Sequence, residues 1–327
     1  MATNLEDIQQ DIIQKHILPR LDGPSLWTIA TTTASSAHLR SLCFNHKLWA
    51  DVSMSTWPSI THPHVHQIIS TFPKRHHSFF QDSFPSLVTY PPSKYLSNSH
   101  HEKDHSLPSE LISLVDIRYK GNIIYSTAHF TNTTSDHFLS SPFQIVLNES
   151  THVPEKFNDL EISNNEASLS LLKESVTLNW IIINPSLKRA GNLSIIKPVS
   201  VSRYGVFNEI VLKYIIVLPG LNPNEMVKCK IKLVLLDANY MEGDTILQVK
   251  EVSLKVQDLV TSNCLNGKDF MVITQRAIME ENNVRRIVID DERRLMSYMQ
   301  LKKIKKDQKD LARKGEEKTK LYMLLVV

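Results

Sequence analysis

The chain carries two kinds of hydrophobic pattern, and the first lies near its N-terminus. Apolar residues recur there at approximately helical spacing: Ile8, Ile12, Ile13, Ile17 and Leu21. Asp22-Gly23-Pro24 then interrupts the pattern, because glycine commonly ends a helix and proline suits the first position of the next. Residues 5–50 therefore predict short helices, of which the third carries Leu39, Leu42 and Cys43.

The second pattern has a period of two residues, which is typical of half-buried strands, and it extends over residues 111–278. Five stretches show it: 115–119, 176–182, 210–216, 229–235 and 252–256. Gly121-Asn122 after the first stretch indicates a hairpin, and Trp180 is expected in the core. Because no long helical pattern separates the strands, we expect an antiparallel β-sandwich-like domain.

The intervening residues 58–110 are rich in histidine and proline, which predicts a connector with one short helix over residues 64–70. His62, His64 and His66 alternate, so an extended segment would place all three imidazoles on one side, as a metal site requires. No pattern of cysteines or paired carboxylates accompanies them, so we favour a polar connector and expect no metal.

Charged residues are unevenly distributed, with an excess of basic residues near the C-terminus. The formal net charge is +3, yet residues 285–320 hold 13 basic and 7 acidic residues. This pattern predicts a solvated basic helix and gives no sign of a uniformly basic nucleic-acid-binding domain. Residues 321–327 are apolar, but they are far fewer than the roughly 20 residues that span a bilayer, so a membrane role is not expected.

Motifs that carry chemistry are missing from the sequence. It contains no nucleophile elbow, phosphate-binding glycine loop or H-E-x-x-H zinc motif, so neither a catalytic site nor a cofactor is expected. Three separated cysteines and the absence of a secretory signal pattern favour a reducing compartment, the cytoplasm and/or the nucleus.

The N-terminal block resembles an F-box, a three-helix module that binds the Skp-type adaptor of SCF ubiquitin ligases. The matching positions are Ile12-Ile13, Ile17-Leu18, Leu21, residues 22–26, Ile29-Ala30, Ser35, Leu39, Leu42 and Leu48-Trp49. Later stretches are similar to a plant group of F-box proteins whose C-terminal domain has a largely unknown ligand, among them residues 56–60, 78–85, 140–143, 178–180, 203–205 and 265–269. The resemblance covers nearly the whole chain.

The resemblance implies a set of adaptor-binding residues: Ile12, Ile13, Ile17, Leu18, Leu21, Pro24, Ser25, Leu26, Ile29, Leu39, Leu42 and Trp49. Pro24 is expected to begin the second helix and to present its ring and Leu26 outward, as apolar anchors at an interface. Pro19 predicts that the first helix ends near Leu18 or kinks there, and the β-branched residues 31–33 predict a short second helix.

The expected fold is therefore α+β, with four parts: a three-helix F-box at 1–57, a His/Pro-rich connector at 58–110, a β-rich recognition domain at 111–278 and a basic helical tail at 279–327. The expected function is that of a non-catalytic substrate-recognition subunit of an SCF-type E3 ubiquitin ligase. Its F-box would bind the adaptor, and through it a cullin, while the β-rich domain would hold an unknown target protein. The alternative is a sandwich that binds a sugar or lipid, with a vestigial F-box. A pocket with converging polar groups would favour that alternative, and an exposed apolar or charged patch would favour a protein target.

Overall fold

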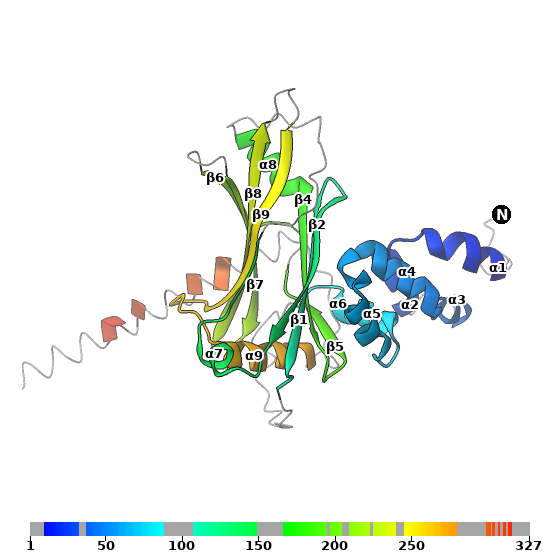
Figure 1. Cartoon of the computed structure of the whole chain (residues 1–327), viewed down its shortest axis with the longest axis horizontal. Coiled ribbons are helices and arrows are strands. Elements are labelled where there is room, and N and C mark those ends of the chain that lie inside the picture. Colours follow the sequence, from blue (N-terminus) through cyan, green and yellow to red (C-terminus); the bar gives the residue numbers. More distant parts are fainter. Residues whose placement is uncertain are drawn as a thin grey trace, which may run out of the picture. The chain divides into compact units, whose positions relative to one another are not determined.

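Helices fill the first quarter of the chain and antiparallel strands most of the rest, which confirms an α+β fold (Figure 1). The computed structural model describes residues 10–32, 37–87, 107–148, 166–194, 197–204, 209–222, 225–239 and 245–279, with single positions between 299 and 315. Two compact units divide the chain, and each is described by itself. Unit 1 comprises residues 1–87, 106–134 and 175–194, and unit 2 comprises residues 88–105, 135–174 and 195–327.

Unit 1 begins with a set of short helices. Their bounds are α1 Gln10–Ile12, a π-helical turn η2 Ile13–Ile17, a 3-10 turn η3 Leu18–Arg20, α2 Gly23–Thr31, α3 Ala37–Leu42, α4 His46–Thr56, η4 Pro58–Thr61, α5 Pro63–Ser70 and α6 His76–Ser83. The π-helical turn η2 ends at Ile17, and Pro19 lies in the 3-10 turn that follows. Proline has no backbone N–H to continue a helix, so this end agrees with the prediction that the first helix stops or kinks near Leu18. The second helix is short, as expected, and ends at Thr31.

Residues 58–87 are helical and packed and do not form an open connector, but α5 lies where the sequence predicted one short helix, over residues 64–70. Pro63 begins helix α5, so His62, His64 and His66 do not lie on one extended segment. Among the described residues, no group of three or more His, Cys, Asp and Glu side chains is placed to hold a metal ion. The rest of the predicted connector, residues 88–106, lies outside the described part of the chain.

The strands of unit 1 form a four-stranded antiparallel sheet in the order β2-β1-β4-β5. Their bounds are β1 Glu110–Tyr119, β2 Asn122–Asn132, β4 Val176–Asn184 and β5 Arg189–Asn192. The predicted hairpin joins β1 to β2, and its turn residues are Lys120 and Gly121, both with positive φ, of 48° and 87°. Two residues with positive φ are what a tight hairpin turn requires. Trp180 is fully buried, as expected.

Apolar packing and polar side chains both join the helices of unit 1 to its sheet. Ile112, Leu114, Ile181 and Ile183 of the sheet share a hydrophobic cluster with side chains of the helices. Arg118 of β1 donates to the carbonyls of Ser55 and Thr56 at the end of α4. These contacts make the helices and the sheet one packed body, with no break at the predicted boundary after residue 57.

Two buried carboxylates complete this junction. Asp116 of β1 accepts hydrogen bonds from Ser126 and from both the backbone N–H and the hydroxyl of Ser59. Burial raises the pKa of Asp116, although these hydrogen bonds act to lower it. Asp82 of α6 accepts from the Arg189 guanidinium at 2.8 Å and from the Ala190 N–H at 3.0 Å, both in β5.

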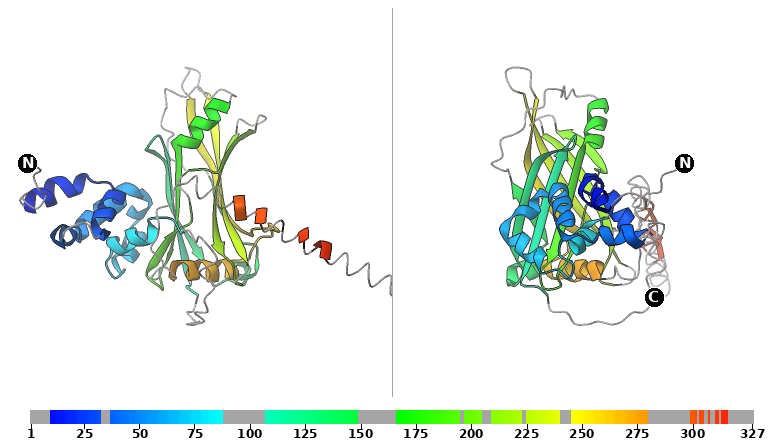
Figure 2. Two further views of the ribbon diagram at one scale, coloured as in Figure 1. Left: turned by 180° about the vertical axis from the view of Figure 1, so that it is seen from behind. Right: turned by 90° about the vertical axis from the view of Figure 1, so that its right-hand side faces the viewer.

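Unit 2 contains a five-stranded antiparallel sheet in the order β3-β9-β8-β7-β6. Its strands are β3 Gln144–Asn148, β6 Ser200–Tyr204, β7 Glu209–Pro219, β8 Met226–Asn239 and β9 Thr245–Asp258, and its helices are α7 Asp136–Ser140, α8 Glu166–Ser175 and α9 Gly267–Met279. Helix α9 runs across one end of this sheet, beside α7 (Figures 1 and 2). Asn266 caps α9 by accepting from the Asp269 N–H, and Phe270 stacks on Phe143 at 3.7 Å between ring centroids.

The described positions between 299 and 315 are helical, in line with the predicted basic helix. Leu301 is buried there against Met226 and Leu259. Residues 280–298 and the apolar residues 321–327 lie outside the described part of the chain. None of the helices that the structure describes is long and apolar enough to cross a membrane.

Candidate adaptor-binding surface

The predicted adaptor-binding residues all lie on the first helices of unit 1, but they divide by burial. Five are buried in the hydrophobic core of the unit: Ile13, Leu18, Leu26, Leu42 and Trp49. Four are half-buried and pack against that core: Ile17, Leu21, Ile29 and Leu39. Three are exposed: Ile12, Pro24 and Ser25. The structure brings the set together on one group of helices, and its role in binding stays a prediction.

Helix α2 shows why the set divides. Gly23, Leu26 and Ala30 recur at steps of three and four residues and are all buried, so they form the inner face of this helix. Pro24 lies on the outer side, as expected, but Leu26 is 0% exposed, so the prediction that it points outward was wrong. Pro24 contributes surface, whereas Leu26 holds the helix in place.

The helices are fixed by local features that the sequence supplies. The Asp22 carboxylate accepts from the Ser25 N–H at 2.8 Å and caps α2, and hydrogen bonding by Ser25 lowers the pKa of that carboxyl. At Gly23, a Cβ atom would lie 2.4 Å from the ring of Phe80, so only glycine allows α2 to approach α6 this closely. The Trp49 indole donates to the Cys43 carbonyl at 2.6 Å and fastens the turn between α3 and α4.

An aromatic cluster includes Trp49 of the predicted set, but its other members, Trp27, Phe44 and His77, were not predicted as part of the site. Phe44 is 48% exposed, more than Ile12 at 41%, and Lys74 lies 5.6 Å from its ring centroid. The ring of His77 lies between Phe44, Trp27 and Trp49. Burial lowers the pKa of His77 to about 4, so this histidine is neutral at physiological pH. The signal available in the sequence was a large aromatic residue, Phe44, directly after Leu42 and Cys43 of the predicted third helix.

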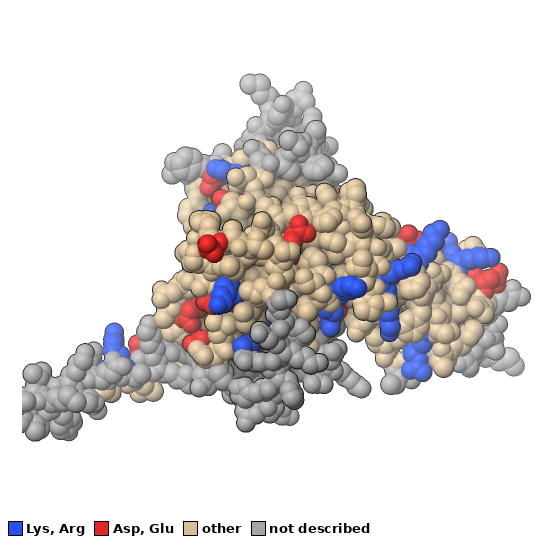
Figure 3. Space-filling view, turned by 60° about the horizontal axis from the view of Figure 1, so that its bottom comes forward, with Lys and Arg blue, Asp and Glu red and all other residues tan. Residues whose placement is uncertain are grey.

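The surface of these helices is basic. Residues 10–32 and 37–87 contain six Lys and Arg residues but only four acidic residues, Asp11, Asp22, Asp51 and the buried Asp82. The cations are Lys15, Arg20, Arg40, Lys47, Lys74 and Arg75. Figure 3 shows Lys and Arg side chains gathered over this part of unit 1, at the right of the view. The helices therefore combine exposed apolar side chains with positive charge, a combination that suits an acidic partner protein.

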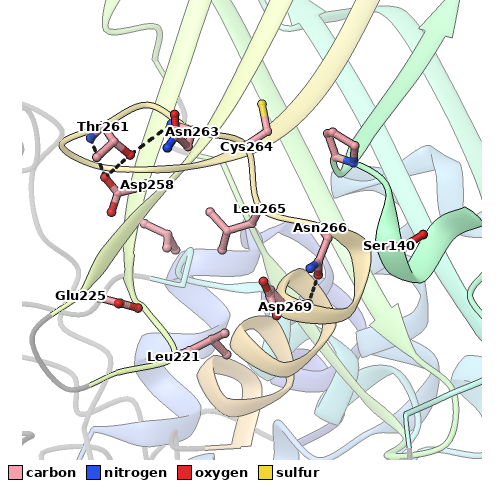
Figure 4. Close-up of a pocket in the computed structure, with 12 residues that line it drawn as sticks. Ser140, Leu221, Glu225, Asp258, Thr261, Asn263, Cys264, Leu265, Asn266 and Asp269 are labelled. Carbon is pink, nitrogen blue, oxygen red and sulfur yellow. Dashed lines mark hydrogen bonds between the residues drawn. The ribbon is translucent and has the colours of Figure 1, made fainter.

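Unit 2 contains a shallow pocket of about 520 Å³ beside the loop that follows β9 (Figure 4). Leu221 and Leu265 contribute apolar surface to it, and Glu225, Asp258 and Asp269 contribute carboxylates. A pocket of this size is large enough to hold a small molecule.

Several polar side chains of the pocket form hydrogen bonds within the loop that follows β9. Asp258 accepts hydrogen bonds from Val260 and Thr261. Burial alone would raise the pKa of Asp258, but these hydrogen bonds hold it below its ordinary value. Thr261 also accepts from the Asn263 N–H, and Asn266 caps α9 (Figure 4). These groups shape a turn and a helix end, and they do not converge on the centre of the pocket.

Comparison with known proteins gives three relatives in Arabidopsis thaliana. F-box protein At2g27310 is 35% identical over 278 residues, which cover 83% of this chain and 78% of that protein. F-box protein At3g44326 is 34% identical over 97% of this chain and 85% of its own length, and Probable F-box protein At2g36090 is 32% identical over 91% and 83%. No family model matches the chain, and no solved structure matches it. The identity extends through both units, and the chain belongs to this family of plant F-box proteins.

Proposed function

We propose that the chain is the substrate-recognition subunit of an SCF-type E3 ubiquitin ligase, acting in the cytoplasm and/or the nucleus. Its first helices bind a Skp-type adaptor, and through it a cullin, while the β-rich part of the chain holds a target protein. The chain performs no bond chemistry of its own, and its contribution to the rate is proximity between the target lysines and the ubiquitin-loaded enzyme. The observation that carries this proposal is the membership in the F-box family over nearly the whole chain.

The burial of the predicted residues supports different tasks for them in this function. Ile12 and Pro24 are exposed, so they contact the adaptor directly. Ile17, Leu21 and Ile29 contribute their exposed parts, and the buried residues position the helices. Apolar anchors at the centre of an interface carry most of the binding free energy, and charged residues around them speed association.

The junction inside unit 1 supports the second half of the proposal. Asp116, Arg118 and Asp82 tie the helices to the four-stranded sheet, so an adaptor bound to the helices fixes the position of that sheet as well. A subunit that works by proximity benefits from such a rigid connection, because a flexible one would spread the target over a larger volume.

A single charge at an exposed position tests the adaptor surface. We expect Ile12→Glu to reduce capture of a co-expressed plant Skp-type adaptor by at least about tenfold, because an unpaired carboxylate would be buried at the interface. The matched control is Leu171→Glu on α8, which is also exposed, at 51%. Both variants are expected to keep the wild-type melting temperature. Equal capture by the two variants would exclude Ile12 from the interface.

The alternative function, binding of a sugar or lipid, gains no support from the pocket in unit 2. Small-molecule sites place a few polar groups so that they converge on the ligand. In this pocket, Asp258, Thr261 and Asn266 form hydrogen bonds with their own loop and helix end. We therefore propose no small-molecule ligand.

A further inference from the structure

Strand β2 forms one edge of the sheet of unit 1, and it is much longer than the other edge strands. It has 11 residues, whereas β3, β5 and β6 have five, four and five. The short edge of β5 is also covered, because Asp82 accepts from the Ala190 N–H and the Leu87 N–H donates to the Asn192 carbonyl. A long open edge offers its N–H and C=O groups to a further strand.

The hydrogen-bond pattern shows which backbone groups of β2 are open. The Thr133 N–H donates to the Ser109 carbonyl, directly beyond the paired residues Asn132 and Glu110. Hydrogen-bonded positions alternate along an antiparallel pair, so odd-numbered residues from 125 onward bond to β1 and even-numbered residues face outward. No described residue bonds to the N–H or C=O groups of the outward residues within the strand, which are Ser126, Ala128 and Phe130.

The side chains of these outward residues leave the edge open. Ser126 donates to Asp116, and Ala128 and Phe130 pack against the hydrophobic cluster that includes the helices. Only backbone groups therefore face the edge.

The edge also lacks the residues that commonly protect edge strands from pairing, which are charged side chains and proline. Residues 122–132 contain no Lys, Arg, Asp, Glu or Pro. Burial lowers the pKa of His129, so this histidine is neutral at pH 7. A register shift lies beside the turn, and residues 125–132 pair regularly with β1. The edge is therefore regular and uncharged where its outward groups lie.

We propose that β2 pairs with β2 of a second copy of this chain, antiparallel about a two-fold axis at Ala128. This axis places Ser126 of each copy opposite Phe130 of the other, so all three outward residues take hydrogen-bonded positions. Each such pair of residues exchanges two hydrogen bonds, which gives about six across the axis. Between them, Thr127 of each copy lies opposite His129 of the other, and no like charges meet.

The same surface serves both copies, as a two-fold dimer requires, and this self-complementarity favours a second copy as the occupant. None of the predicted adaptor-binding residues belongs to β2. The inference therefore goes beyond the function proposed above and does not depend on it. A dimer would carry two adaptor surfaces and could hold a target at two points, which strengthens binding without new contacts.

The first test measures the molar mass of the full chain by size-exclusion chromatography with light scattering, over a range of concentrations. We expect a dimer that dissociates on dilution. Ala128→Pro removes the outward N–H on the axis and should weaken association at least about tenfold. Proline is tolerated on an edge strand where the N–H faces outward, so the diluted variant should keep the wild-type melting temperature. The control, Thr127→Val, keeps every N–H and should associate like the wild type.

Cysteine cross-linking reads the register independently of that variant. All chains carry Cys264→Ser, because Cys264 is an exposed free cysteine. Across the proposed axis, the Cα atoms of residues 127 and 129 lie about 4.5 Å apart, within the range of a disulfide. Thr127→Cys chains mixed with His129→Cys chains should therefore form a linked dimer with oxidised glutathione. Neither variant alone should do so, since its own cysteines lie more than about 7 Å apart.

Three outcomes would overturn the proposal. The mass of one chain at every concentration would leave the edge to another occupant, such as an extended segment of the target. A dimer that Ala128→Pro leaves unchanged would place the interface elsewhere, and a cross-link in either cysteine variant alone would exclude the axis at Ala128. Adaptor capture by the same variants should equal that of the wild type, so the two proposals fail or stand separately.

Discussion

Leu26→Ala is expected to lower the free energy of unfolding of unit 1 by about 2–5 kcal/mol. The Leu26 side chain is fully buried on the inner face of α2, and its loss leaves a cavity among the other core residues. Chemical denaturation followed by tryptophan fluorescence measures this change, because Trp27, Trp49 and Trp57 belong to the same hydrophobic cluster as Leu26. Pro24→Ala is the matched control, two residues away and exposed, and should cost less than about 1 kcal/mol.

This result would also decide how adaptor binding is mapped. A Leu26 variant that loses the adaptor does so through unfolding of the helices, so its failure to bind says nothing about direct contact. If Leu26→Ala proved as mild as Pro24→Ala, Leu26 would have to lie at the surface, in contradiction to its burial.

Asp116→Ala is expected to be the most damaging change at the junction between the helices and the sheet of unit 1. It leaves the N–H and hydroxyl of Ser59 and the hydroxyl of Ser126 without their acceptor. Each buried donor left unpaired costs about 1–3 kcal/mol, so we expect a loss of at least about 2 kcal/mol in the free energy of unfolding. Thermal unfolding of the full chain measures it.

Asp116→Asn is the conservative control, because its amide oxygen can still accept from the Ser59 N–H and the Ser126 hydroxyl, while its amide NH2 replaces the second oxygen and donates to the Ser59 hydroxyl. Its cost should stay below about 1 kcal/mol, since it also removes a buried charge. Because burial raises the pKa of Asp116 above 3.8, the folded chain binds a proton there that the unfolded chain releases. The stability of the wild type relative to Asp116→Asn should therefore fall as the pH rises from about 3.8 through the raised pKa. Equal stability of the Ala and Asn variants would show that the hydrogen bonds of Asp116 contribute little.

The sequence predicted the elements whose patterns are local. The two-residue alternation located β4, β7, β8 and β9, and Pro19 and the threonine run located the ends of the first two helices. The sequence did not predict the short strands β3, β5 and β6, because four or five residues give too few alternations to identify a strand. The turn between β1 and β2 is one residue earlier than the Gly121-Asn122 signal indicated.

The remaining differences come from tertiary packing. Asp116 looked like a residue of the polar face of β1, yet it is buried because η4 supplies its hydrogen-bond donors from 57 residues away. Residues 58–87 looked like a connector because of their prolines, but Pro58 and Pro63 each begin a helical turn. Leu26 matched the F-box pattern, but that pattern does not separate residues that touch the adaptor from residues that support them. These distinctions depend on contacts between distant segments.

Hydrogen exchange of the full chain, with and without a plant Skp-type adaptor, tests the central claim most directly. The account predicts a stable complex in which amide exchange slows in residues 10–32 and 37–42 and stays unchanged in β7, β8 and β9. This result would place the adaptor on the first helices and leave the sheet of unit 2 available to the target. A folded chain that forms no complex, or protection confined to the strands of unit 2, would contradict the account.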